Sequence, residues 1–145
     1  MSDQPPTDEN LKGLPSEEEL LQATTLLYYL HETNPVTGLV RDKTDPAAPA
    51  SIAAIGLALA STPILVEHGV VSREFAPGLI LRLLRFLRAS PQGPEPDATG
   101  YRGFYYHFLH MKTGRRVWNC ELSSVDSAFL FAGMLTCAGL LRRRH

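Results

Sequence analysis

Residues 100–133 read GYRGFYYHFLHMKTGRRVWNCELSSVDSAFLFAG, an aromatic and polar loop that runs directly into an apolar, helix-forming segment. The pattern over 104–119 predicts a short β-hairpin, with its turn at 112–115. Aromatic rings stack on the apolar faces of sugars, while carboxylates bind sugar hydroxyls or supply the acid and base that cleave a glycosidic bond. Because Glu121 and Asp126 follow the aromatic run, this stretch predicts a carbohydrate site.

Four helices are expected along the chain. They span residues 16–33, 49–68, 72–89 and from Ser123 or Ser124 to about 142. The first begins with a capping box, in which Ser16 is followed three residues later by Glu19. The first and third helices are amphipathic, whereas the second and fourth are apolar on most sides. Apolar helices belong inside and amphipathic helices outside, so this order predicts an all-α fold in which two antiparallel helix pairs form part of an α/α toroid or superhelix.

The two long connections, 34–48 and 91–122, are expected at the same end of the fold if successive helices are antiparallel. This end holds the N-termini of the inner helices, and long loops commonly carry functional residues. The side chains there that can bind or transform a ligand are Arg41, Asp42, Tyr101, Arg102, Tyr105, Tyr106, His107, Trp118, Asn119, Glu121 and Asp126. We therefore expect the site at this end.

Glu121 and Asp126 form the acidic pair of this set, and each has a structural alternative. Asp126 follows Ser123 by three residues, which is also the spacing of a capping box, and capping is compatible with a role in the site. Glu121 is expected to pair with Arg115 or Arg116 across the hairpin, unless it contacts substrate.

Other residue types in this loop suggest structural roles more than chemical ones. Trp118 is interpreted as half-buried packing in preference to a platform for a sugar ring. His107 and His110 have only isolated carboxylates nearby, so no metal site is expected. The sequence contains no glycine-rich phosphate loop and no thiol nucleophile pattern, and no cofactor is expected.

The composition is that of a single globular domain of 145 residues with a net charge of −1. This balance provides no overall field for nucleic acid or for an anionic membrane, and neither is expected as a partner. Residues 46–66 carry no charge, but their small and polar residues favour a buried helix over a membrane span. Residues 1–15 are polar and proline-rich and lack the apolar region of a signal peptide, so we expect a disordered leader and a cytoplasmic protein.

Three motifs, in this order, resemble the N-terminal part of the bacterial glucoamylase-like family. They are NPVTGLVRD at 34–42, ASIAAIGLAL at 50–59 and the long stretch at 100–133. The resemblance covers about residues 17–141. It implies an (α/α)6 toroid of twelve helices in six pairs, with relatives that include glycoside hydrolases acting on β-1,2-glucans and the matching region of cyclic β-1,2-glucan synthases.

The resemblance also implies roles for two acidic residues and a limit on the chain. Asp126, in SVDSAFL, falls where family members carry an acidic residue at the mouth of an inner helix, and Asp42 lies in the matching TGLVRD loop. Family domains are much longer, so residues 16–145 are expected to form a truncated glucoamylase-like domain with about four of the twelve helices. The exposed flanks of apolar helices would then favour self-association or docking with a completing polypeptide.

The leading hypothesis is a truncated glucoamylase-like domain, related to glycoside hydrolases acting on β-glucans, that contacts a glucan or oligosaccharide at the N-termini of its inner helices. Asp126 is expected as the acid, base or hydroxyl-binding carboxylate, with Glu121 as the second catalytic candidate. The expected substrate-binding residues are Arg41, Asp42, Tyr101, Arg102, Tyr106, His107 and Trp118. The alternative hypothesis is a non-catalytic helical binding or assembly module.

Overall fold

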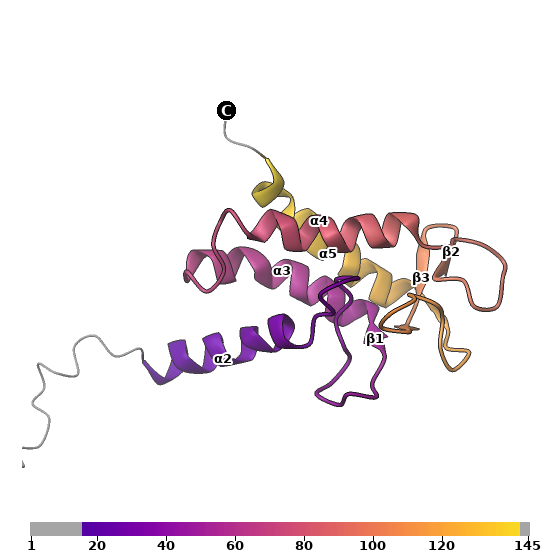
Figure 1. The fold of residues 1–145 in the computed structure, drawn as a ribbon, viewed down its shortest axis with the longest axis horizontal. Coiled ribbons are helices and arrows are strands. Elements are labelled where there is room, and N and C mark those ends of the chain that lie inside the picture. The colour runs from indigo at the N-terminus through magenta and orange to yellow at the C-terminus, as the bar shows by residue number, and fades with distance from the viewer. Residues whose placement is uncertain (1–15, 143–145) are drawn as a thin grey trace, which may run out of the picture.

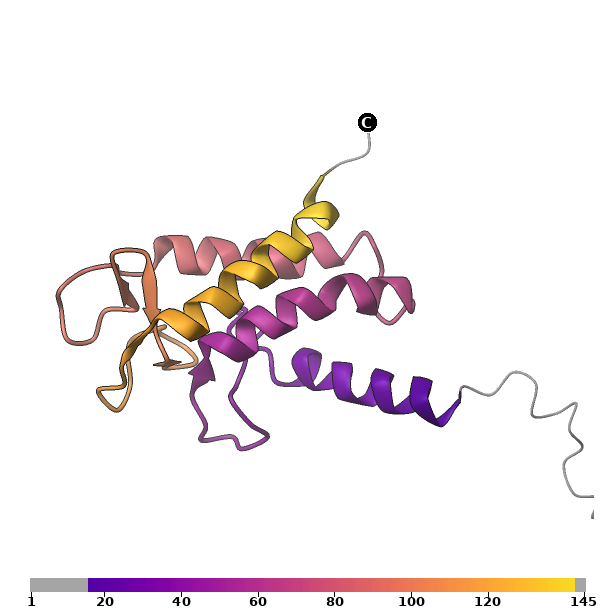
Figure 2. The same cartoon turned by 180° about the vertical axis from the view of Figure 1, so that it is seen from behind.

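The computed structural model describes residues 16–142, so the expected leader at 1–15 lies outside the described residues. The described residues form four helices: α2 (Glu17–His31), α3 (Ile52–Glu67), α4 (Ala76–Ala89) and α5 (Ser124–Leu141). In Figures 1 and 2, α2 and α4 run in one direction while α3 and α5 run in the other. The four predicted helices are therefore present, arranged as two antiparallel pairs.

Two helices begin later than the sequence predicts. Helix α3 begins at Ile52, because the preceding residues Ala50 and Ser51 are extended and pair with another strand. Helix α4 begins at Ala76, because residues 72–75 form a separate turn in which the Phe75 N–H donates to the Ser72 side chain over 3.2 Å. The first helix begins as predicted, since Ser16 and Glu19 form a complete capping box.

Five short strands surround the N-termini of the inner helices (Figure 1). They are β1 (Ala50–Ser51), β2 (Gly100–Tyr101), β3 (Phe104–Tyr106), β4 (Phe108–Leu109) and β5 (Leu122–Ser123). One antiparallel sheet contains β1 and β4, and the other has the order β2-β3-β5. These strands lie at the loop end of the fold, where both long connections are found.

The expected hairpin at 104–119 is present but short, and the all-α class is only partly right. An antiparallel bridge between Leu109 and Arg116 joins its two sides, and the N–H groups of His110 and Val117 donate across it to the carbonyl oxygens of Arg115 and Phe108. The aromatic segment also pairs with the extended residues that precede α3 and α5, which the sequence did not predict. Those residues have backbone groups outside the helices that need hydrogen-bond partners, and the 104–109 segment supplies them.

The two inner helices touch through their backbones at a pair of glycines. A Cβ atom placed on Gly133 of α5 would lie 2.1 Å from the carbonyl oxygen of Gly56 of α3. A Cβ on Gly56 would lie 2.3 Å from the carbonyl oxygen of Phe129. Because neither position has space for a side chain, glycine at both positions allows α3 and α5 to pack closely along each other.

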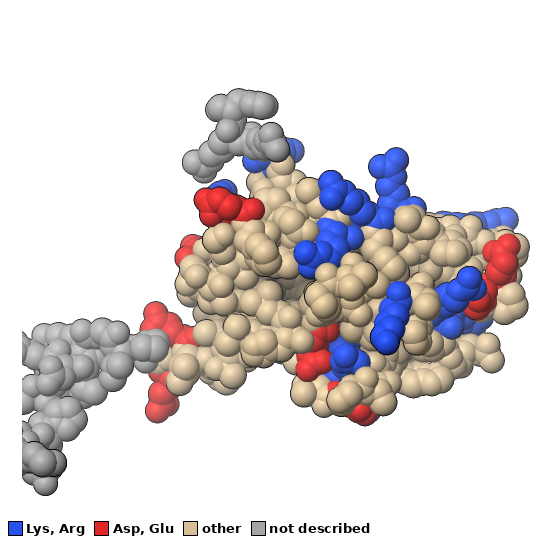
Figure 3. All heavy atoms as spheres, in the orientation of Figure 1, with Lys and Arg blue, Asp and Glu red and all other residues tan. Residues whose placement is uncertain are grey.

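The core lies between these inner helices, α4 and the first loop. Its fully buried side chains include Leu39, Ile52, Ile55, Ile80, Leu109 and Leu130. Helix α4 is amphipathic, with Leu83 and Leu87 buried and Arg85 and Arg88 exposed. Figure 3 shows lysine and arginine side chains gathered over α4 and the loop end on this face.

One flank of α5 is apolar and exposed. Val125, Phe129 and Leu135 are 65%, 47% and 78% exposed, respectively. By length and composition alone, α5 is also the one helix of the described residues that could cross a membrane, although the core helix of a soluble fold satisfies the same test. The segment at 46–66 contains most of α3, whose residues Ile52, Ile55 and Leu59 are buried.

We expect Gly133→Ala to lower the free energy of unfolding by about 1–3 kcal/mol, because the added methyl group forces the inner helices apart. The matched control is Gly139→Ala in the same helix, where an added Cβ meets nothing within 4 Å. This control is expected to gain up to about 1 kcal/mol through helix propensity. Urea unfolding measures both, and equal stability of the two variants would contradict the close contact between α3 and α5.

Candidate functional site

The 104–109 segment connects the N-termini of both inner helices. Strand β3 pairs with β5, which leads into α5, while β4 pairs with β1, which leads into α3. His107 lies between β3 and β4. Its backbone N–H donates to the carbonyl oxygen of Glu121, and its carbonyl oxygen accepts from the N–H of Ile52, each over 3.1 Å. The backbone of His107 is therefore fixed at the point where the two inner helices begin.

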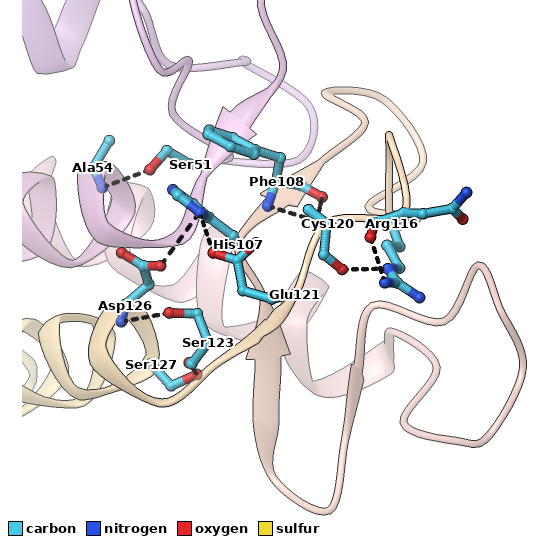
Figure 4. Close-up of polar contacts among 11 residues, drawn as sticks. Ser51, Ala54, His107, Phe108, Arg116, Cys120, Glu121, Ser123, Asp126 and Ser127 are labelled. Atoms are coloured by element: carbon cyan, nitrogen blue, oxygen red, sulfur yellow. Dashed lines mark hydrogen bonds and ion pairs between the residues drawn. The ribbon is translucent and has the colours of Figure 1, made fainter.

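The His107 ring faces two carboxylates (Figure 4). Its Nδ1 lies 2.8 Å from Oε1 of Glu121 and 3.7 Å from Oδ2 of Asp126. An ionised carboxylate can only accept, so Nδ1 donates to Glu121. The side chains of Asp126, His107 and Glu121 are 14%, 29% and 65% exposed. Asp126 is thus the most buried of the three side chains, and Glu121 is the most exposed.

Asp126 is only partly engaged in capping α5. Its backbone N–H donates to the Ser123 hydroxyl over 3.1 Å, as an N-cap requires. Its carboxylate faces His107 and, within residues 16–142, accepts no hydrogen bond. The reciprocal half of the expected capping box is therefore missing, which leaves the carboxylate available to a ligand.

Strand β3 is fixed to the start of α5 by a buried hydroxyl. The Ser127 Oγ accepts from the Tyr105 N–H over 2.9 Å and donates to the Ser123 carbonyl oxygen over 2.6 Å. Ser127 is fully buried, so both bonds are shielded from water. The position of the strand relative to Asp126 is set by this contact.

The electrostatic environment of Glu121 differs from the expected one. Its own backbone N–H and the His107 ring both donate to the carboxylate, and they hold the pKa of Glu121 below its ordinary value. The ion pair predicted with Arg115 or Arg116 is wrong. Arg115 pairs with Asp97, while Arg116 donates to the carbonyl oxygens of Cys120 and Asn119 over 2.6 and 2.7 Å.

A row of aromatic rings extends from the carboxylates. The His107 and Phe108 rings are stacked, with centroids 3.8 Å apart, and the Phe108 and Trp118 rings meet edge to face at 5.5 Å. Trp118 is 72% exposed, so the prediction that it is half-buried packing is wrong. Phe108 was not among the site residues predicted from the sequence. Neighbouring residues of one strand point to opposite faces, so His107 and Phe108 were expected apart. The chain changes from one sheet to the other at His107, and this change brings the His107 and Phe108 rings together.

Arg41 and Trp118 line one groove of about 450 Å³ between the first loop and the turn at 110–118. Arg41 is held in this groove by an ion pair with Glu32 at 2.9 Å and by bonds from Nη1 to the carbonyl oxygens of Pro46 and Ala48. The groove adjoins the aromatic row through Trp118.

The remaining predicted residues lie outside the carboxylate cluster. Tyr106 is covered by the Arg116 guanidinium, 4.3 Å from its ring centroid. Tyr101 and Arg102 contact each other where the chain passes from β2 to β3, at 5.2 Å. Asp42 is exposed in the first loop, where its backbone N–H bonds to the Pro49 carbonyl oxygen. The structure therefore brings together Asp126, Glu121 and His107, but not these four residues.

No metal site was expected from the sequence, because the carboxylates near His107 were taken to be isolated. In the structure, Glu121 and Asp126 both lie beside this histidine. One ligand atom from each of His107, Glu121 and Asp126 lies within 4.8 Å of the others. These residue types can bind a divalent cation. However, α3 and α5 both direct their N-terminal ends, with partial positive charge, toward this region, and that charge opposes a cation.

Comparison with solved structures finds the same fold in part of several longer proteins. A β-1,2-glucanase from Parabacteroides distasonis superposes with a TM-score of 0.75 at 23% identity, over 97% of this chain and 19% of that chain. A "putative glucoamylase" from Bacteroides uniformis gives a TM-score of 0.68 at 27% identity, over 84% of this chain and 30% of that chain. An endo-β-1,2-glucanase from Chitinophaga pinensis, in complex with sophorotriose and glucose, gives a TM-score of 0.68 at 19% identity, over 85% of this chain and 31% of that chain.

The chain thus spans between about a fifth and a third of the length of these structures. No protein-family model and no curated protein matches the sequence. The structural neighbours match most of this chain and are β-1,2-glucanases and putative glucoamylases, the kinds of protein that its motifs resemble, so the chain shares their fold.

Proposed function

We propose that this chain is part of a glucoamylase-like domain acting on β-glucans, in which Asp126, Glu121 and His107 contact the sugar at the N-termini of the inner helices. The observation that carries this proposal is the convergence of two carboxylates on one imidazole, in a fold whose structural neighbours include β-1,2-glucanases. Sugar hydroxyls are donors, and the carboxylate oxygens of this cluster can accept from them.

Asp126 is the main candidate for chemistry in this proposal. Its carboxylate is 14% exposed and, among the described residues, receives no hydrogen bond. A mostly buried carboxylate in this state gains free energy when a hydroxyl or a water molecule donates to it. A bound glucan would supply such a donor, and Asp126 would then orient a hydroxyl or act as acid or base.

Glu121 suits an accepting role better than an acidic one. Its lowered pKa keeps the carboxylate ionised, so it can accept a hydrogen bond or take a proton but has none to give. Oxygens of Glu121 and Asp126 lie within 4.8 Å, shorter than the roughly 6.5–9.5 Å between the carboxyl groups of an inverting pair and nearer the roughly 5–5.5 Å of a retaining pair. Because both face the same imidazole, they would act from one side of the sugar, and an opposing carboxylate would come from another part of the domain.

A second candidate function, an assembly module, is favoured by the exposed flank of α5. Val125, Phe129 and Leu135 are exposed on a helix that packs on α3, and Val125 and Phe129 line one apolar depression. Apolar surfaces of this kind mark contacts with other polypeptides. Self-association or a completing polypeptide would cover this flank.

If Asp126 contacts the glucan, Asp126→Asn weakens sophorotriose binding about tenfold or more, as expected for the loss of a hydrogen bond to a charged group. Isothermal titration calorimetry on the full chain measures this affinity. The matched control is Glu67→Gln, at the opposite end of α3, which should bind like the parent chain. Unchanged binding in Asp126→Asn would contradict the proposed role.

His107→Ala should raise the pKa of Glu121 toward its ordinary value, because one of the two donors to the carboxylate is lost. The shift is only partial, since the backbone N–H of Glu121 remains. Because the pKa is lowered in the folded protein, this contribution to stability is present above the unfolded-state pKa and is lost as pH falls through the folded-state value. Titration of side-chain carboxyl signals by NMR measures the shift; His110→Ala serves as control, and an unshifted pKa in His107→Ala would refute the contact.

The assembly function predicts a mass above that of the monomer in light scattering. Replacing Val125 and Leu135 together by lysine should return the chain to a monomer, because charged side chains oppose burial of this flank. Val36→Lys is the control, since Val36 is 80% exposed in the first loop, away from α5. A parent chain that is monomeric at all accessible concentrations would count against self-association.

A further inference from the structure

We propose that the groove between the first loop and the turn at 110–118 is a sugar-binding subsite, separate from the carboxylates, in which one glucan ring stacks on Trp118. The class of ligand rests on the proposed function. The location of the subsite rests on independent features of the groove, namely the presentation of Trp118, the donors on its walls and its continuity with the aromatic row.

The exposure of Trp118 is imposed by a strained backbone. Trp118 and Asn119 have φ values of 57° and 49°, in the left-handed region that side-chain-bearing residues seldom adopt. Arg116 maintains this conformation by donating to the carbonyl oxygens of Asn119 and Cys120. Backbone strain that is held by surrounding contacts is concentrated at functional sites. The bulky indole is therefore held in solvent by an unfavourable backbone conformation, and this conformation is not needed to pack the core.

The walls of the groove place fixed donors beside the indole. The Asn34 Oδ1 accepts from the N–H groups of Val36 and Thr37, which orients the amide and leaves its Nδ2 without a partner among the described residues. The Arg41 guanidinium is anchored through Nε and Nη1, and its Nη2 makes no hydrogen bond within residues 16–142. Preorganised donors of this kind bind an oxygen-rich ligand without losing side-chain entropy.

The lining and shape of the groove suit a sugar. The charge of Arg41 is balanced by Glu32 at 2.9 Å, so its guanidinium offers directed N–H groups, and Lys112 adds a further N–H donor to the lining. Pro46, Ala47 and Trp118 provide apolar surface next to these donors. A sugar ring has the same two characters, an apolar face and a rim of hydroxyls, and a groove of about 450 Å³ falls within the size range of ligand pockets.

The aromatic row connects this subsite to the carboxylates. The Phe108 ring contacts Trp118 on one side and His107 on the other. A glucan that stacks on Trp118 and extends along this row reaches the cluster of His107, Glu121 and Asp126. The subsite would therefore hold a neighbouring sugar unit of the same chain.

The chain contains a single tryptophan, so selectively excited tryptophan fluorescence reports on this groove alone. Titration of the full chain with sophorotriose should give a saturable change in emission and protection from acrylamide quenching. By calorimetry, Trp118→Ala should weaken binding about tenfold, and Trp118→Phe should retain most of the affinity. The control is Phe104→Ala, an exposed aromatic residue on β3 outside the groove, which should leave binding unchanged.

The outcomes separate this inference from the proposed function. One outcome is that Asp126→Asn abolishes sophorotriose binding, while Trp118→Ala binds like the parent chain and the parent's tryptophan emission does not change on titration. The groove is then not a subsite, but the proposed function stands. If Trp118→Ala weakens binding and Asp126→Asn does not, the subsite is supported and the role of the carboxylates is overturned. If the parent chain, shown to be folded by circular dichroism, binds no sophorotriose, both are overturned.

Discussion

The backbone contact between Gly56 and Gly133 is the constraint on which the rest of the structure depends. Without a Cβ at either position, α3 and α5 approach closely around these glycines, and their N-termini emerge side by side (Figure 2). The extended residues that precede them are then close enough to be bridged by one short segment of chain, 104–109. A larger residue at either glycine would separate the helices and, with them, the His107 ring from the Asp126 carboxylate.

The bridge explains why the candidate site has its particular composition. The 104–109 segment changes partner at His107, from the strand leading into α5 to the strand leading into α3. The change interrupts the alternation of side chains, so His107 and Phe108 stack on the same side. One ring then faces the acidic residues at the start of α5, and the other supports Trp118. The link between carboxylates and aromatic surface is thus a consequence of strand pairing.

Local signals predicted the helices well, whereas the site depended on contacts that are distant in sequence. The capping box at Ser16 and the alternation of amphipathic and apolar helices gave the four helices and their inner and outer order. The pairing of Ala50 with Leu109 has no local signature, so only the local hairpin, in which Leu109 is bridged to Arg116, was predicted. From that hairpin followed the incorrect arginine partner for Glu121. The left-handed backbone conformation at Trp118 was not predicted either, because such positions are usually recognised in a sequence by a glycine, and none is present here.

The two candidate functions are physically linked through α5. Ser124 and Val125 line a shallow apolar depression that continues along Ala128 and Ala132, and Asp126 lies in the same first turn of the helix. The carboxylate of Asp126, however, faces His107, whereas the depression lies on another side of the same helical turn. A polypeptide that covers the apolar flank of α5 would therefore leave the carboxylates open to a ligand. Association along α5 and sugar binding at its N-terminus are thus compatible in one molecule, since they use different sides of the helix.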